Sequence, residues 1–335
     1  MSRSGVEAKP PWRSVPLGVR RRVAEVLGAA VARGTRVWGG YGPTPTFRLT
    51  LSDGRRAFLK AADSSTTEFI RRALAQEERV YRELSDLIGS WAPRFYGAFH
   101  HDEWHVLLLE DVGPQSIPPW GLVPTRQITH TYAEFHAATL GQDLPLWLPR
   151  PNTWLHEITW SAVAAELDGL RTLAALAGAQ AGVAHHWLRA ALPVLARAVD
   201  AAAELPGPHA LLHLDTRSDN LRFTRGRLSL FDWPWAGVGR PEFDVVEFAQ
   251  SVTVEGGVEP EQILAWYGEH LPLRPDALDA ATAWLAAFFA EAAWRPDIPG
   301  LPRLRTFQRQ QLSVVLPWAA RRLQLPAPTW VSAIV

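Results

Sequence analysis

The pattern of apolar residues changes its period once along the chain, and that change constrains the fold more than any other feature. Apolar and polar residues alternate in TFRLTL and again in RRAFLKA, which is typical of β-strands with one buried face. From Thr125 onward the apolar residues recur mainly at the spacing of an α-helix. We therefore expect a bilobal α+β protein, in which a small antiparallel β lobe with one helix precedes a larger, mainly helical lobe.

The expected lobes divide the chain into three regions. Residues 1–34 are predicted to form a leader whose helix, RRRVAEVLGAAVARG, ends at Gly34. Residues 35–112 are predicted to form the β-rich lobe, with a single helix over residues 66–88. A Pro-rich stretch follows and is typical of a connection, so residues 113–335 are assigned to the helical lobe.

One β-rich segment interrupts the helical half, and it carries three residues at a spacing typical of phosphoryl transfer. Asp215 lies in a predicted loop, Asn220 follows five residues later, and Asp232 ends the second strand of a predicted hairpin. Phosphoryl transfer needs a carboxylate to orient or deprotonate the attacking hydroxyl, and Mg²⁺ held by hard oxygen ligands. The alternative is a loop with ordinary turn-forming Asp and Asn residues. The spacing favours the phosphoryl-transfer interpretation.

The stretch LLHLDTRSDNLRF, with the later LSLFDWPWAGVGRPEFDVVEF, resembles the aminoglycoside phosphotransferase and choline kinase-like branch of the protein-kinase-like superfamily. The resemblance implies a bilobal kinase-like fold and a small-molecule kinase. It implies that Asp215 is the catalytic base and that Asn220 and Asp232 bind Mg²⁺. It further implies that His213 and Asp244 support the catalytic loop from within.

Three positions in and after this loop depart from the kinase or family pattern. Arg217 stands where the protein-kinase catalytic loop has a lysine near the transferred phosphate, and a solvated arginine is the alternative interpretation. The family pattern has glycine between the His and the Asp, whereas this chain has Leu214. The acid that often follows the Asp-Trp pair is Pro234 here. We expect these departures to change the local loop geometry and the acceptor rather than the reaction.

The first lobe offers the cation that a nucleotide site requires. Only Lys9 and Lys60 are lysines among the basic residues, and Lys60 ends an alternating strand. The resemblance implies that Lys60 binds the α- and β-phosphates and pairs with Glu77 of the following helix. Glu78 is the second choice for the partner of Lys60. The alternative interpretation of Glu77 is an exposed acid on the helix surface. The resemblance also implies nucleotide contacts at three further positions. These are Gly40, Glu110 and Val112.

Composition excludes several classes of function. The 34 basic and 34 acidic residues cancel, which disfavours a nucleic-acid or anionic-membrane partner. The chain has no cysteine, so thiolate metal sites and cysteine nucleophiles are excluded, and a cytoplasmic location is expected. No apolar run reaches the length of a membrane span. The histidines, among them His100, lack the sequence spacing of a metal site and are predicted to be surface or core residues.

The acceptor is inferred from charge distribution. Residues 241–297 contain eleven Asp or Glu and two Arg. The resemblance implies that these helices form the acceptor pocket, which favours a cationic acceptor such as an aminoglycoside, another antibiotic or an aminosugar. Solvated helix faces are the alternative interpretation of these acids. The co-substrates are then ATP or GTP with Mg²⁺. The alternatives are a metabolic small-alcohol kinase of the choline or homoserine type, and a non-catalytic nucleotide-binding regulator. A protein kinase is disfavoured, because only eleven residues separate Asp232 from Asp244 and leave no room for a long activation segment.

Overall fold

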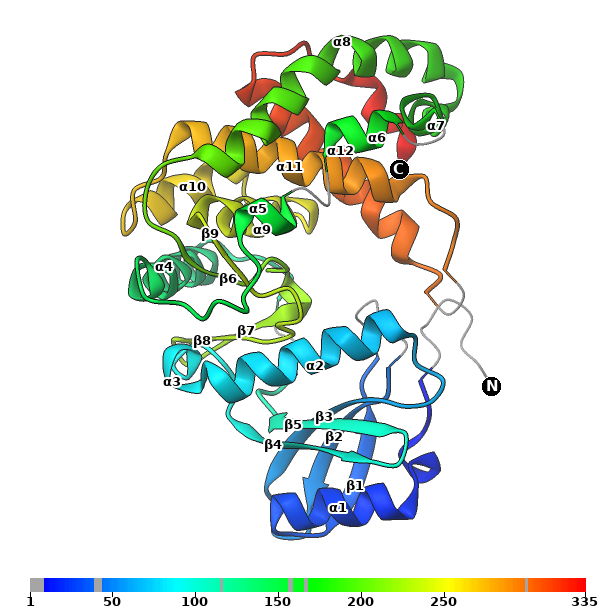
Figure 1. The fold of residues 1–335 in the computed structure, drawn as a ribbon, viewed down its shortest axis with the longest axis vertical. Helices are drawn as coiled ribbons and strands as arrows, with labels where there is room; N and C mark the ends of the chain where they lie inside the picture. The colour runs from blue at the N-terminus through cyan, green and yellow to red at the C-terminus, as the bar shows by residue number, and fades with distance from the viewer. Residues whose placement is uncertain (1–8, 39–43, 115–116, 156–158, 166–167, 299–300) are drawn as a thin grey trace. The chain divides into compact units, whose positions relative to one another are not determined.

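The structure is a computed structural model, and its described residues form two compact units (Figure 1). The described residues are 9–38, 44–114, 117–155, 159–165, 168–298 and 301–335. We call the two units the sheet unit and the helical unit. The sheet unit comprises Met1–Ser116, Asp219–Trp235 and Ile298–Arg303, and the helical unit comprises Ile117–Ser218, Ala236–Asp297 and Leu304–Val335.

A five-stranded antiparallel sheet forms the framework of the sheet unit. Its strands are β1 (Val31–Arg36), β2 (Thr46–Leu51), β3 (Arg56–Ala62), β4 (Phe95–His101) and β5 (Trp104–Glu110). The order across the sheet is β1-β2-β3-β5-β4, so the two hairpins join through β3 and β5. The alternating segments TFRLTL and RRAFLKA form β2 and β3, which confirms the predicted meander.

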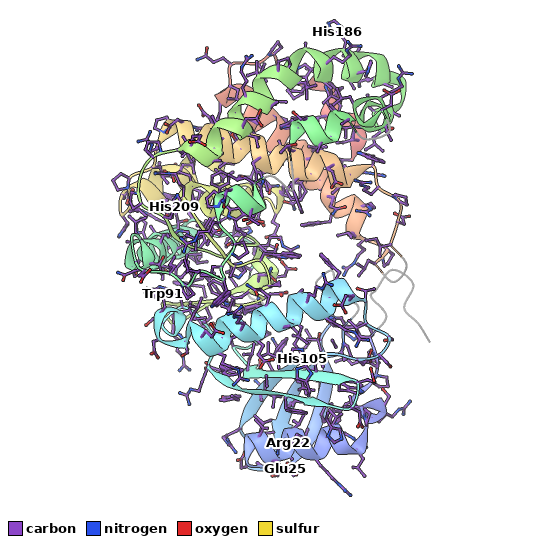
Figure 2. The ribbon with its side chains drawn as sticks, viewed as in Figure 1. Arg22, Glu25, Trp91, His105, His186 and His209 are labelled. Carbon is purple, nitrogen blue, oxygen red and sulfur yellow. The ribbon has the colours of Figure 1, made fainter. Side chains whose placement is uncertain are left out.

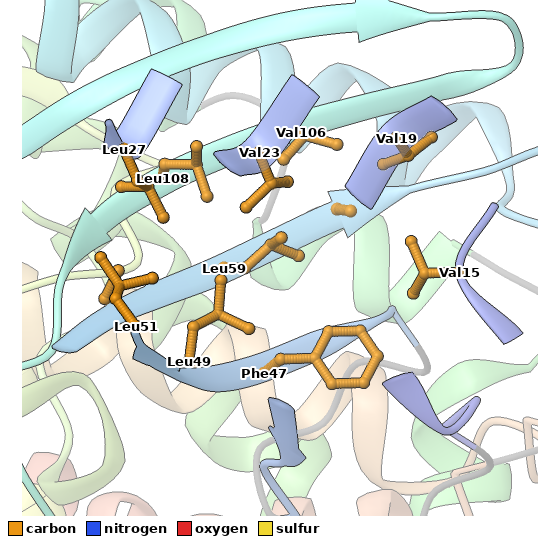
Figure 3. Close-up of a cluster of buried hydrophobic side chains, with 12 residues drawn as sticks. Val15, Val19, Val23, Leu27, Phe47, Leu49, Leu51, Leu59, Val106 and Leu108 are labelled. Carbon is orange, nitrogen blue, oxygen red and sulfur yellow. The ribbon is translucent and has the colours of Figure 1, made fainter. Parts of the chain in front are cut away.

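Helix α1 (Leu17–Leu27) packs on one face of this sheet and covers an apolar core (Figure 3). Its buried residues Val19, Val23 and Leu27 recur every four positions and therefore form one stripe. The strands contribute alternate residues, which all point to this face. They are Phe47, Leu49, Leu51, Ala57, Leu59, Ala61, Val106 and Leu108.

The prediction that the first helix continues to Gly34 is wrong. The helix ends at Leu27, because Gly28 adopts a left-handed conformation with φ of 68° and its N–H donates to the carbonyls of Ala24 and Glu25. The following residues Val31–Arg36 form β1 and pair with β2. Small apolar residues after Gly28 fit either period, so sequence alone did not reveal the change.

Substitution of Gly28 by alanine is expected to destabilise the protein by about 1 kcal/mol, because a side chain disfavours the left-handed conformation. No atom lies within 4 Å of the Cβ position, so the effect is purely conformational. Gly182 provides the matched control, since its Cβ position is equally open and its φ is helical. Gly182→Ala is expected to stabilise by up to about 1 kcal/mol. Urea unfolding of both variants measures the difference, and equal effects of the same sign would contradict it.

Helix α2 (Glu68–Glu83) covers the opposite face of the sheet (Figure 1). The predicted single helix over residues 66–88 is interrupted, because Leu84 leaves helical geometry with φ of −112° and the short helix α3 (Ser85–Ile88) follows. A separate hairpin, β7 (Leu221–Thr224) and β8 (Arg227–Leu230), also belongs to this unit. A backbone hydrogen bond of 2.6 Å, from the N–H of Leu230 to the carbonyl of Trp91, connects this hairpin to the rest of the sheet unit. Trp91 is labelled in Figure 2.

The helical unit consists of nine α-helices and one two-stranded sheet in its described residues. The helices are α4 (Leu122–Thr139), α5 (Pro151–Trp154), α6 (Trp160–Ala165), α7 (Gly169–Ala175), α8 (Ala181–Asp200), α9 (Pro241–Val254), α10 (Pro260–Gly268), α11 (Pro275–Ala293) and α12 (Leu304–Arg322). The strands are β6 (Ala210–Leu212) and β9 (Gly237–Gly239). No helix in the described part of the chain combines the length and apolar character that crossing a bilayer requires.

Two helices, α9 and α12, lack the sequence signals from which helices are predicted. Helix α9 is buried at every position from Pro241 to Val252, so it shows no contrast between an apolar and a polar face. Helix α12 contains Pro317, a residue that normally disrupts a helix interior. The mainly helical region predicted from Thr125 onward is confirmed by helices such as α4, α8, α10 and α11.

Candidate active site

Lys60 lies between two carboxylates of the sheet unit. Its Nζ is 2.6 Å from Oε2 of Glu77 and 2.5 Å from Oδ1 of Asp232. The Glu77 side chain is 1% exposed and that of Lys60 is 19% exposed, so the contact between them is shielded from water, whereas the Asp232 side chain is 36% exposed. Burial alone would lower the pKa of Lys60, but Asp232 and Glu77 outweigh it and raise that pKa above its ordinary value. Lys60 is therefore a fixed cation.

The local folding of three elements creates this cluster. Lys60 points to the face of the sheet that α2 covers, because the core residues Leu59 and Ala61 point to the other face. Glu77 is a buried residue of α2. The second choice from sequence, Glu78, instead contacts Arg82 and His105. The structure therefore pairs Lys60 with Glu77 rather than with its neighbour.

Asn220 and Asp232 lie at the same end of the β7–β8 hairpin. The hairpin pairs Leu221 with Leu230, and the N–H of Phe231 donates to the carbonyl of Asn220 at 3.0 Å. Asp232 is the next residue and has φ of 68°, a conformation that few non-glycine residues adopt and that re-aims the chain after the strand. An amide oxygen and a carboxylate at one hairpin end are hard donors of the kind that Mg²⁺ prefers. This donor set fits a magnesium ion.

The end of β5 carries the predicted nucleotide contacts Glu110 and Val112. The Glu110 carboxylate accepts from the backbone N–H of Arg94 at 3.1 Å and lies 3.7 Å from Arg227. The backbone N–H of Glu110 already donates to the Arg94 carbonyl at 2.8 Å, so it is used within the sheet unit. Val112 is partly buried. The predicted contact at Gly40 lies outside the described residues.

Two arginines that sequence reasoning missed converge after Val112. Arg48 and Arg222 both donate to the carbonyl of Gly113, and Arg48 also lies 3.4 Å from Asp111. Burial, followed by the nearby Arg48 charge, lowers the pKa of Arg222 to about 10. In an Arg-rich sequence neither residue stood out, so only the tertiary structure reveals this positive cluster.

Asp244 braces the predicted catalytic loop within the helical unit. It is fully buried, and its two oxygens accept from the backbone N–H groups of His213 at 2.6 Å and Leu214 at 2.8 Å. His136, which sequence reasoning missed, lies 3.1 Å from Oδ2 and contacts the Tyr267 hydroxyl at 2.7 Å. Burial alone would raise the pKa of Asp244, but hydrogen bonding to His136 and the His213 amide outweighs it and lowers the pKa below its ordinary value.

The departure at Leu214 has a structural counterpart. Leu214 has φ of 56°, the left-handed region in which glycine is favoured. Its N–H bond to Asp244 helps to hold this conformation. Leu214 thus adopts a left-handed conformation that glycine adopts more easily, which is consistent with the glycine of the family pattern.

Substitution of Asp244 by asparagine is expected to lower the free energy of unfolding at pH 7 by about 3 kcal/mol, since it removes a buried charge that satisfies two backbone donors. Because the folded-state pKa of Asp244 lies below its unfolded value, this stability is present above about pH 4 and is lost as pH falls through the folded pKa. Denaturant unfolding at pH 7 and pH 3 should therefore show a smaller difference from wild type at pH 3. Exposed Asp143→Asn is the control; a deficit independent of pH would contradict the account.

Asp215 and Arg217 form a two-point ion pair. Arg217 Nε lies 2.7 Å from Oδ1 of Asp215, and a terminal nitrogen donates to Oδ2 at 3.2 Å. The Arg217 guanidinium also lies over the ring of Phe307 at 5.2 Å. The side chains of Asp215 and Arg217 are 20% and 13% exposed. Arg217 is thus not a freely solvated arginine, and it orients the carboxylate of Asp215.

Two further acids, the buried Glu247 and the partly buried Glu255, hold the same loop. Glu247 accepts from the N–H of Thr216 at 3.3 Å, and burial followed by the charge of Asp215 raises the pKa of Glu247 well above its ordinary value. Glu255 accepts from the hydroxyl of Ser218 at 2.6 Å and from the indole N–H of Trp120 at 2.8 Å. Sequence periodicity could not identify these acids, because they resemble ordinary helix residues until the loop folds against them.

Most acids of the segment 241–297 are used within the protein. Several pair with arginines or a histidine at the surface: Glu261 and Asp279 with Arg322, Glu269 with Arg126 and His130, Asp276 with Arg274, and Glu291 with Arg295. Others, such as Glu242 and Asp244, are buried beside their partners. The acidic composition of this segment is therefore not a measure of charge offered to a ligand.

The sequence matches the profile of the phosphotransferase enzyme family (APH) over residues 33–278, which is well over half of the 335-residue chain. No curated protein matches the chain in sequence.

Solved structures with the same fold act on different acceptors. The aminoglycoside phosphotransferase APH(4)-Ia, as a thermostable mutant, is 15% identical with a TM-score of 0.57, covering 94% of this chain and 98% of its own. A candidate fructosamine-3-kinase from Thermobifida fusca YX-ER1 is 21% identical, with a TM-score of 0.52 and coverages of 91% and 98%. A macrolide 2'-phosphotransferase from Brachybacterium faecium is 17% identical, with a TM-score of 0.53 and coverages of 92% and 99%. A second structure of the thermostable aminoglycoside enzyme is a ternary complex with ADP and hygromycin B. These similarities show an α+β, kinase-like fold.

Proposed function

Because this chain belongs to the phosphotransferase enzyme family, we propose that it transfers the γ-phosphoryl group of ATP or GTP to a hydroxyl of a small molecule. The observation that carries the proposal is Lys60, held between Glu77 and Asp232 in the sheet unit. A cation fixed by a helix carboxylate is the arrangement that kinases use to bind nucleotide phosphates.

In the proposed nucleotide site, Lys60 binds the α- and β-phosphates, and Glu77 keeps its ammonium group in place. Asn220 and Asp232 would hold Mg²⁺ at the end of the β7–β8 hairpin. When bound, the ion neutralises negative charge on the β- and γ-phosphates. Gly40, Glu110 and Val112 remain proposed nucleotide contacts, of which only the last two lie in described residues.

Asp215 is the proposed catalytic base. It accepts the proton of the acceptor hydroxyl as that oxygen bonds to the γ-phosphorus and the bond to the bridging β–γ oxygen breaks, releasing ADP or GDP. Arg217 keeps the carboxylate oriented and supplies positive charge beside it. His213 and Asp244 support the loop that carries both.

For the acceptor we propose an aminoglycoside-like compound, another antibiotic or an aminosugar. The support is family membership together with the aminoglycoside and macrolide acceptors named for two of the similar structures. The internal pairing of acids in residues 241–297 removes the charge argument for a polycationic acceptor. It favours, as second candidate, a small metabolic hydroxyl compound such as an alcohol or a glycated amine, in line with the candidate fructosamine kinase.

A product-mass screen tests this proposal. The protein is incubated with Mg²⁺ and either ATP or GTP over aminoglycosides, macrolides, aminosugars, fructosamines and small alcohols, and each acceptor is examined for one added phosphoryl group. We expect turnover in one class with stoichiometric nucleoside diphosphate. Nucleotide binding without transfer to any class would favour the non-catalytic regulator instead.

A further inference from the structure

Three side chains with metal-binding atoms meet in the sheet unit apart from the Lys60 ion pairs. They are His100 on β4, His105 on β5 and Glu78 on α2, and their ligand atoms all lie within 4.8 Å of one another. Nε2 of His105 is 2.6 Å from Oε2 of Glu78. The two imidazole rings stack with centroids 4.2 Å apart at an interplanar angle of 21°. Figure 2 labels His105 on the strands next to α2.

The fold brings these residues together although their sequence spacing does not suggest a metal site. His100 and His105 are direct cross-strand partners near the tip of the β4–β5 hairpin, so their side chains leave the sheet on the same face. His105 also pairs with Ala62 of β3, two residues beyond Lys60, which places it on the face that α2 covers. Glu78 reaches them from that helix. The earlier expectation that His100 is only a surface or core residue rested on sequence spacing alone.

The donor set determines which ion suits the cluster. Two imidazoles and one carboxylate are the ligands of three-ligand zinc sites, in which a fourth position stays open. Mg²⁺ and Ca²⁺ prefer sites made wholly of oxygen, so they are not expected here. The second carboxylate oxygen of Glu78 accepts from Arg82 at 2.6 Å and is thereby oriented.

The geometry requires only a small adjustment. Tetrahedral Zn²⁺ with bonds of about 2.0–2.1 Å places its ligand atoms about 3.3 Å apart. The contact between His105 and Glu78 is already shorter than that, and His100 is an exposed side chain that can rotate toward both. The positive charge of Arg82 offsets part of the attraction between the Glu78 carboxylate and a metal ion. We therefore expect Zn²⁺ to bind more weakly here than in a closed structural site with four protein ligands.

We infer that Glu78, His100 and His105 form a binding site for Zn²⁺ or a similar transition-metal ion that ties α2 to the β4–β5 hairpin. The site is independent of the proposed magnesium position. A metal ion at this site would also affect the position of Glu77, because Glu77 and Glu78 are consecutive residues of α2. An ion bound to Glu78 fixes the segment of α2 that presents Glu77 to Lys60.

Equilibrium dialysis of the untagged full-length protein against Zn²⁺, followed by metal analysis, tests the inference without depending on catalysis. Wild type is expected to bind one Zn²⁺ that His100→Ala and Glu78→Gln each weaken about tenfold or more. Co²⁺ should give visible absorption bands of a low-coordinate site that are lost in the same variants. Bound Zn²⁺ should also raise the unfolding temperature of wild type more than that of His100→Ala.

His101→Ala is the matched control, since His101 lies on the same hairpin but its ring is directed at Gly18 of α1, on the other face of the sheet. It should bind Zn²⁺ as wild type does. Because His100 is exposed, its replacement is not expected to prevent folding, and circular dichroism verifies this. Equal Zn²⁺ binding by wild type, His100→Ala and Glu78→Gln, or no Zn²⁺ binding by wild type, would overturn the inference.

Discussion

Asp215→Asn is expected to lower kcat for phosphoryl transfer about a thousandfold while the protein still folds and binds Mg-nucleotide. Asparagine preserves the shape of the side chain, and its oxygen can still accept from Arg217, but it cannot take the proton of an acceptor hydroxyl. Single-turnover transfer to the acceptor found by screening measures the loss. Calorimetric titration with Mg-nucleotide measures binding separately.

Asp219→Asn is the matched control, because it makes the same change of charge in the same loop at a position with no proposed role in proton transfer. We expect its kcat to stay within a few-fold of wild type. If Asp215→Asn retained most of its turnover, or if both variants lost it equally, Asp215 would not be the base.

Lys60→Met is expected to have two effects, one on stability and one on activity. It leaves the buried Glu77 carboxylate without its cation, which should cost about 3 kcal/mol or more of unfolding free energy. It also removes the proposed phosphate contact, so kcat/KM for nucleotide should fall by about 100-fold or more. Denaturant unfolding and steady-state kinetics measure these effects on the same preparation.

The double variant Lys60→Met with Glu77→Gln separates the two effects. Neutralising Glu77 removes the unpaired buried charge, so we expect much of the lost stability to return. Activity should stay low, because the phosphate contact is still missing. Recovery of activity together with stability would show that Lys60 serves only the fold.

Local patterns were sufficient to predict the framework of the sheet unit. Alternation identified β2 and β3, and a loop-hairpin spacing identified the segment that contains Asp215, Asn220 and Asp232. These signals survive in sequence because they depend on near neighbours along the chain. The pairing of Lys60 with Glu77 was suggested by the family resemblance and not by periodicity.

Features that depend on distant parts of the chain were not predictable in this way. Helix α9 is buried at every position from Pro241 to Val252 and therefore shows no polar face. The partners of the catalytic loop are distant in sequence: His136 lies on α4, Glu247 on α9, and Glu255 directly after α9. The acceptor prediction was affected most, because it counted the acids of residues 241–297 as a ligand surface. In the structure most of these acids bind other groups of the protein.

Label transfer from nucleotide to acceptor tests the central claim most directly. Wild-type protein is given Mg²⁺ and γ-labelled ATP or GTP with the acceptor panel, and the position of the label is determined by fragmentation of the product. Our account predicts that the label is found on a hydroxyl oxygen of one acceptor class, in proportion to the nucleoside diphosphate released, and that Asp215→Asn abolishes the transfer. Saturable nucleotide binding by wild type with no label on any acceptor would contradict it.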